Sequence, residues 1–137
     1  MPEKIYSGGC VCGRLRYEAV GEPIYAGFCY CSDCRKVSGS GSIPFIGFKS
    51  DRVSITGDSR ETRTISTNGG EAVRNACSTC GSFVFGGARG ISEWHTIYAG
   101  SLDDASLFEP QMAIFVKDRV PWAHVPEDLP SYETLPD

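Results

Sequence analysis

The distribution of seven cysteines along 137 residues constrains the fold more than any other feature of the sequence. They fall into one cluster of three and two close pairs: Cys29, Cys31 and Cys34; Cys10 and Cys12; Cys77 and Cys80. An odd number of cysteines argues against a fully disulfide-paired scaffold. Alternate residues of a strand also point the same way without reaching disulfide distance. Closely spaced cysteines in a reducing compartment are typical of metal ligands or catalytic thiols, so we interpret them as metal ligands, with buried metal-free thiols as the alternative.

The number of thiols predicts two different metal sites. A structural zinc site is normally closed by four protein ligands, whereas a catalytic zinc keeps one position for water or substrate. We therefore predict a structural zinc held by the two pairs and a catalytic zinc held by the central cluster. The structural ligands would be Cys10, Cys12, Cys77 and Cys80, and the catalytic ligands Cys29, Cys31 and Cys34. Thiolate ligands favour zinc over harder ions, and ligand type alone leaves iron as an alternative.

Composition and charge exclude several classes of protein. The formal net charge of −4 and the pI of about 5.2 disfavour nucleic-acid binding, which usually needs a basic surface. The longest apolar runs, such as residues 113–116, are too short to cross a bilayer, and the N-terminus lacks the apolar region of a signal peptide. We expect a cytoplasmic protein with neither a membrane nor a nucleic acid as partner. The sequence leaves its oligomeric state open, including a homo-oligomer.

Alternating hydrophobicity and frequent turn residues predict a mainly β protein. The expected strands cover residues 14–20, 24–29, 42–48, 53–56, 62–67, 82–85, 94–99 and 112–116. Ser32 is predicted to cap a single helical turn over residues 33–37. The two cysteine pairs are expected to clip the sheets across a long sequence separation, and the proline-rich tail from Pro121 to lie extended over the body.

Four other polar residues near or outside the cysteine motifs have two interpretations each. Arg35 and Lys36 directly follow the central cluster, where they would attract an anionic substrate or form an ordinary solvated pair. His95 and His124 are the only histidines. We interpret them as packed or surface residues rather than as a fourth ligand or a general base.

Three cysteine motifs together resemble a known enzyme family. They are Gly-Gly-Cys-x-Cys-Gly at 8–13, Cys-x-Cys-Ser-x-Cys-Arg-Lys at 29–36 and Cys-x-x-Cys-Gly at 77–81. This pattern resembles the glutathione-dependent formaldehyde-activating (GFA) enzymes, whose domain also occurs in centromere protein V. The resemblance continues through residues 100–104, 114–116 and 121–122, so we predict a single GFA-type domain over residues 5–136.

The resemblance implies a fold, an activity and roles for the cysteines. It implies a β-tent fold of small zinc-bound sheets and carbon–sulfur lyase chemistry. Enzymes of this kind join formaldehyde to the thiol of glutathione, giving S-(hydroxymethyl)glutathione, or run the reverse reaction. The resemblance gives the same division of ligands: two pairs around a structural zinc and the central three around a catalytic zinc. Glutathione or a related thiol and a small aldehyde are therefore the expected partners.

The chain departs from the family pattern at two positions, where Tyr30 and Ala113 replace residues that are commonly histidine. One alternative is a non-catalytic zinc module whose surface binds another protein. A second is a thiol-redox enzyme similar to methionine sulfoxide reductase B. That family needs a nucleophilic cysteine near its C-terminal end, and no cysteine follows Cys80, so we reject it.

Overall fold

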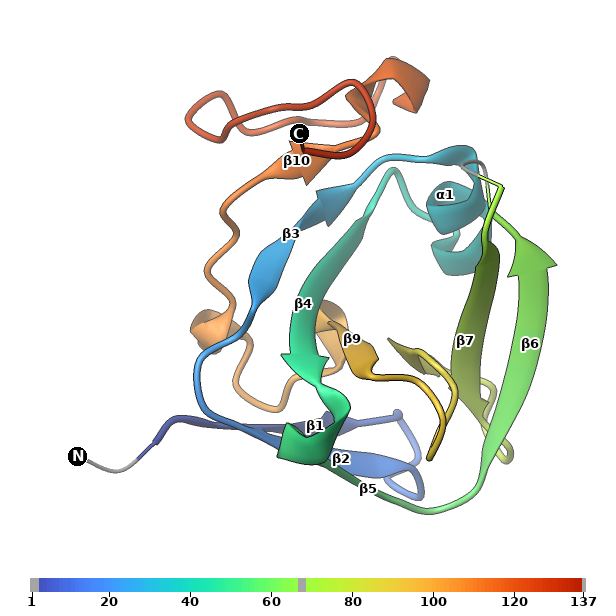
Figure 1. The fold of residues 1–137 in the computed structure, drawn as a ribbon. Coiled ribbons are helices and arrows are strands. Elements are labelled where there is room, and N and C mark those ends of the chain that lie inside the picture. Colours follow the sequence, from blue (N-terminus) through green and yellow to red (C-terminus); the bar gives the residue numbers. More distant parts are fainter. Residues whose placement is uncertain (1–2, 67–68, 137) are drawn as a thin grey trace.

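The computed structural model describes residues 3–66 and 69–136, and most of these residues belong to short strands and turns (Figure 1). The strands are β1 Ile5–Gly9, β2 Arg16–Val20, β3 Tyr25–Cys29, β4 Ile43–Lys49, β5 Val53–Thr56, β6 Ser59–Ile65, β7 Glu71–Cys77, β8 Phe83–Gly86, β9 Trp94–Tyr98 and β10 Ala113–Ile114. The helix α1 covers Ser32–Ser38, and short 3-10 turns cover 50–52, 99–101, 105–107 and 116–118. Within the described part of the chain, no helix is long and apolar enough to cross a membrane.

The strands form two sheets of unequal size. The small sheet has the order β1-β2-β5, and the large sheet has the order β10-β3-β4-β9-β8-β7-β6. Neighbours are antiparallel except β10, which runs parallel to β3. In Figure 1 the large sheet curves from β3 and β4 round to β7 and β6, and the small sheet lies across its lower end. The prediction of a mainly β fold of small sheets is confirmed.

The alternation of side chains along β4 divides the interior into two regions. Ile46 and Phe48 point toward the small sheet and are about 1% exposed, and the Phe48 ring lies 5.2 Å from that of Tyr6. Phe45 points to the other face and packs with Cys29. Successive strand residues face opposite sides, so one face of the large sheet is buried against the small sheet and the other faces the central cysteines.

The helix α1 begins one position earlier than expected. Its N-cap is Cys31 rather than Ser32, because the Cys31 sulfur accepts a hydrogen bond from the backbone N–H of Cys34 at 3.2 Å. The helix ends at Gly39, whose φ of 68° is the left-handed conformation that glycine adopts without a steric penalty. The cap therefore places a sulfur at the start of the helix, where backbone N–H groups are free.

The C-terminal segment also differs from the expected strand over 112–116. Only Ala113–Ile114 is strand, because Phe115 adopts a left-handed conformation with φ 56° and leads into a 3-10 turn. The tail then crosses over β10, where the Tyr132 N–H donates to the carbonyl oxygen of Ala113 at 2.9 Å. This course agrees with the extended tail that the prolines predict, and Figure 1 shows the tail above β10 and β3.

Candidate functional site

The two cysteine pairs come together between the two sheets. Cys10 follows β1 and Cys77 ends β7, so one pair belongs to the small sheet and the other to the large sheet. The four sulfurs lie within 4.8 Å of one another. The Cys10 and Cys12 sulfurs are 3.5 Å apart, and those of Cys12 and Cys77 are 3.7 Å apart. Sulfurs about 2.3 Å from a tetrahedral zinc would be about 3.8 Å apart, so this spacing fits a tetrathiolate site.

Hydrogen bonds favour the thiolate form of Cys10 and Cys80 in this four-cysteine cluster. The Leu15 N–H donates to the Cys10 sulfur at 3.2 Å, and the Cys80 N–H lies 3.5 Å from the Cys77 sulfur. A hydrogen bond with the Ser82 hydroxyl lowers the pKa of Cys80 to about 5. Hydrogen bonds to the charged form lower a pKa, and the thiolate is the form that binds metal. The cluster can therefore hold a metal ion that joins the two sheets.

The central three cysteines form a second cluster at the junction of β3 and α1. Cys29 ends β3, Cys31 caps the helix and Cys34 lies in its first turn. Their sulfurs also lie within 4.8 Å of one another. In the part of the chain that the structure describes, no histidine, aspartate or glutamate completes this group as a fourth ligand. A metal ion held here would have a coordination position that the described residues do not fill.

Negative charge in the three-cysteine cluster is concentrated on Cys31. Hydrogen bonds with Cys29 and Cys34 hold the pKa of the Cys31 thiol well below its usual range, with help from the Cys34 N–H. The same interactions raise the pKa values of Cys29 and Cys34, because a second thiolate would lie beside the first. A divalent cation would relieve this repulsion, which is the usual chemical role of a metal among neighbouring thiols.

A cavity of about 590 Å³ opens beside the three-cysteine cluster and distinguishes it from the other cluster. Cys29 and Cys34 lie on its wall, whereas none of the four cysteines of the other cluster lines it. The remaining wall comes from the exposed face of the large sheet and the end of the tail. Most of this wall is apolar, and its polar side chains include Arg74 on β7 and Tyr98 on β9.

The polar residues of the cavity were not identified in the sequence. Arg35 and Lys36, the cations expected near the cluster, are not among the residues that line the cavity. Arg74 does line it and is 8% exposed. No local motif marks Arg74 or Tyr98, because strand pairing across more than forty residues brings them near Cys29. No strand was predicted over residues 71–77, where Arg74 lies on β7.

The two departures from the family pattern lie together and away from the cavity. Tyr30 and Ala113 are at most 1% exposed and share a small buried cluster with Val116. The Tyr30 hydroxyl donates a hydrogen bond of 2.6 Å to the backbone carbonyl of His124. Neither Tyr30 nor Ala113 lines the cavity. The large tyrosine packs beside the small alanine, so these replacements change a packing cluster rather than the cavity wall.

His95 is a packed residue, as expected. It is 3% exposed, and its Nδ1 lies 3.1 Å from the carbonyl oxygen of Gly86. Burial lowers the pKa of His95, so the ring is neutral at neutral pH and Nδ1–H donates to that carbonyl. His95 belongs to neither cysteine cluster.

Comparison with known families agrees with the cysteine geometry. A family model described as glutathione-dependent formaldehyde-activating enzyme matches residues 5–118. The chain belongs to this family. The GFA match includes every cysteine of both clusters, whereas the last part of the tail lies beyond it.

A solved structure supports the fold of this GFA-family chain. It is the crystal structure of a Rhodobacter sphaeroides protein determined in a structural genomics programme. The TM-score is 0.53 and the sequence identity 21%, with 76% of this chain and 96% of the other chain covered. At this identity the likeness is one of fold. No curated protein matches the chain.

Proposed function

We propose that this protein is a zinc-dependent carbon–sulfur lyase that joins a small aldehyde to a thiol, or runs the reverse reaction. Membership of the GFA family supports formaldehyde and glutathione, or a related thiol, as the reactants. The observation that carries the proposal is the contrast between the two cysteine clusters. One cluster has four thiols and lies outside the cavity, whereas the other has three thiols and forms part of the cavity wall.

The cysteines have different roles in this proposal. Two zinc ions would be held, a structural one by the four-cysteine cluster and a catalytic one by Cys29, Cys31 and Cys34. When bound in the cavity wall, zinc would supply Lewis acidity and stabilise a substrate thiol as thiolate. The helix N-terminus fixes Cys31, whose sulfur is held by the Cys34 N–H. The single domain over residues 5–136 and the cytoplasmic location, where such thiols stay reduced, are parts of the same proposal.

Tyr98 is the residue of the cavity best suited to act on the aldehyde oxygen. Burial raises the pKa of Tyr98 to about 12, so its hydroxyl keeps its proton at neutral pH. In the condensation, the thiolate sulfur forms a bond to the carbonyl carbon, and the carbonyl π electrons move to the oxygen. The Tyr98 O–H can donate a hydrogen bond to that oxygen and then transfer its proton to it, and solvent returns a proton to the Tyr98 oxygen. Thiols add to aldehydes readily in water, so the main contribution of the protein would be to hold the two reactants together in the right orientation. The cavity walls supply this.

Cobalt substitution separates this proposal from the alternative of a non-catalytic zinc module. We expect the visible spectrum of the cobalt-loaded protein to change when a thiol substrate such as glutathione is added, because the three-cysteine cluster leaves a position for it. Exchange NMR of formaldehyde and glutathione should then show faster exchange with the zinc-loaded protein than with the Cys31→Ser variant. A thiol-insensitive cobalt spectrum together with uncatalysed exchange would instead support the non-catalytic module.

A further inference from the structure

Arg74 is a buried cation that has no acidic partner among the described residues. It is 8% exposed, and its Nη1 donates to the Thr64 hydroxyl at 3.0 Å. The ion pairs in residues 3–66 and 69–136 involve other arginines. A guanidinium has five N–H donors and stays protonated, and buried charges are normally paired. Thr64 and Tyr98 are neutral hydrogen-bond partners of this guanidinium, so Arg74 offers an unneutralised positive charge to the cavity that it lines.

Strand pairing places Arg74 on the same face of the large sheet as the rest of the cavity floor. Arg74 lies opposite Gly86, and Gly86 lies opposite Thr96. Gly86 has no side chain to fill the space between them, and a Cβ there would meet only ordinary contacts at 3.4 Å or more. Tyr98, two positions along β9 from Thr96, faces the same side and is close enough for Arg74 to act on its pKa. The Arg74 guanidinium therefore borders the same cavity as Cys29 and Cys34.

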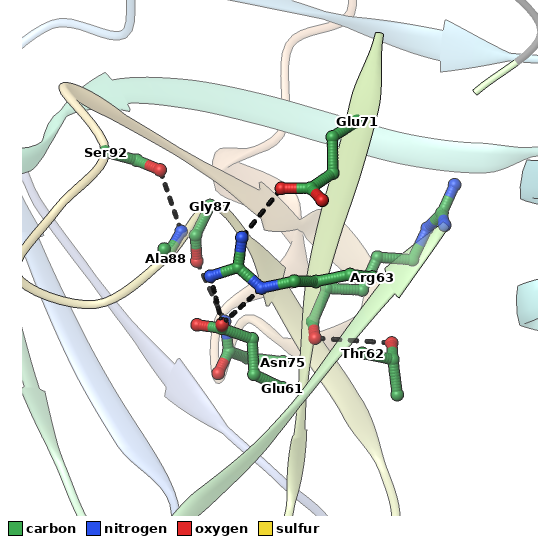
Figure 2. Close-up of polar contacts among 9 residues, drawn as sticks. Glu61, Thr62, Arg63, Glu71, Asn75, Gly87, Ala88 and Ser92 are labelled. Atoms are coloured by element: carbon green, nitrogen blue, oxygen red, sulfur yellow. Dashed lines mark hydrogen bonds and ion pairs between the residues drawn. The ribbon is translucent and has the colours of Figure 1, made fainter. Parts of the chain in front are cut away.

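The other walls of the cavity limit what can bind there. Phe45, Trp94, Met112 and Ile114 supply apolar surface. Glu71 also borders the cavity, but its carboxylate accepts a hydrogen bond from Arg63 at 2.7 Å, as Figure 2 shows. Among the described residues that line the cavity, Arg74 is thus a cation without an ion-pair partner, and most of the remaining wall is apolar. Glutathione carries two carboxylates and one ammonium, which this set of groups matches poorly.

We propose that Arg74 is the anion-binding residue of the cavity, and that the thiol substrate is a small amphipathic molecule with a single carboxylate on an apolar body. The carboxylate pairs with the guanidinium, the apolar body lies along the aromatic and aliphatic walls, and the thiol reaches the three-cysteine cluster. The thiol part of this assignment rests on the proposed lyase function. The carboxylate and the apolar body of the ligand are inferred from the residues of the cavity alone, independently of that function.

Binding of two probes without a thiol tests the assignment independently of catalysis. Hexanoate and 1-hexanol are titrated into the zinc-loaded full chain by calorimetry. We expect hexanoate to bind at least tenfold more tightly than 1-hexanol, because hydrogen bonds to a charged group are strong in a buried site. Among acetate, butyrate and hexanoate, each added methylene should strengthen binding about two- to fourfold. Glutathione should bind more weakly than 6-mercaptohexanoate.

Matched variants identify the residue responsible. Arg74→Gln should weaken hexanoate binding at least tenfold while changing 1-hexanol binding less than twofold. Arg16→Gln, which removes an arginine paired with Asp103 outside the cavity, should change neither. Equal binding of the two probes by the unmodified protein would overturn the assignment even if Arg74→Gln fails to fold, and so would an equal loss of both probes in that variant. Carboxylate preference without turnover would refute only the lyase function, whereas turnover without this preference would refute only the anion site.

Discussion

A comparison of Cys77→Ser with Cys31→Ser tests the division of the cysteines into a structural and a catalytic site. Both residues are buried, at 1% and 7% exposure, so the substitutions are chemically matched. They differ in the length of chain that a bound metal would close. The four-cysteine cluster joins Cys12 to Cys77 across 65 residues, whereas the other cluster lies within residues 29–34.

The loop lengths give the expected difference in stability. Treating each metal as a cross-link, the chain-entropy relation gives about 4 kcal/mol for a 65-residue loop and about 2 kcal/mol for a loop of about five residues. We therefore expect Cys77→Ser to lower the free energy of unfolding by about 4 kcal/mol or more, a large share of the total for a domain of this size. Cys31→Ser should lower it by about 2 kcal/mol or less and abolish turnover.

Urea unfolding followed by circular dichroism gives the stability, and metal analysis gives the zinc content. We expect two zinc ions in the unmodified protein and one in a folded Cys31→Ser. The reasoning would be refuted if Cys31→Ser unfolded or lost both metals, or if Cys77→Ser kept its stability. Loss of the fold or of both metals in Cys31→Ser would mean that the three-cysteine cluster supports the fold, and unchanged stability of Cys77→Ser would mean that the cluster between the sheets does not.

Three further predictions concern the glycines and the buried histidine. Gly57→Ala should destabilise the protein by about 2 kcal/mol or more in urea unfolding, because its φ is 96° and a Cβ would lie 1.9 Å from the Arg14 carbonyl oxygen. Gly90→Ala is the control: its φ is 74° but a Cβ there meets open space, so it should cost about 1 kcal/mol. Burial lowers the pKa of His95 from 6.5, so the unfolded chain binds a proton that the folded chain does not, and stability should fall as the pH drops below about 6.5. The urea midpoint should therefore decline more steeply between pH 7 and 5 than in His95→Gln, and parallel curves would contradict this. Gly86→Ala should change the free energy of unfolding by no more than about 1 kcal/mol, since the new Cβ meets only ordinary contacts. It should raise KM for the thiol, because the new methyl group narrows the cavity. An unchanged KM would mean that the substrate binds elsewhere.

The sequence predicted the cysteine motifs and most of the strands because both depend on short-range patterns. Ligand spacing within a knuckle is local, and alternating side chains mark strands wherever one face is buried. The strands β1 and β7 were not predicted, and two further errors arose where one residue changed the local geometry. A sulfur took the capping role expected of Ser32, and the left-handed Phe115 ended the last strand early.

The cavity could not be predicted because distant strand pairing assembles it. Cys29, Arg74 and Tyr98 lie on different strands of one curved sheet, and no spacing along the chain relates them. A pattern of apolar and polar residues gives each strand its faces but not its neighbours. Only the observed order β3-β4-β9-β8-β7 places the arginine beside the space that the thiols border.

Leu135 and Pro136 line the cavity, although the family match ends at residue 118. The tail that carries them is held over β10 by backbone hydrogen bonds, which tolerate many side chains. Part of the cavity wall is thus supplied by a stretch of the polypeptide that carries no cysteine. Exchanging the side chains at positions 135 and 136 would reshape that wall without altering any cysteine of the two clusters.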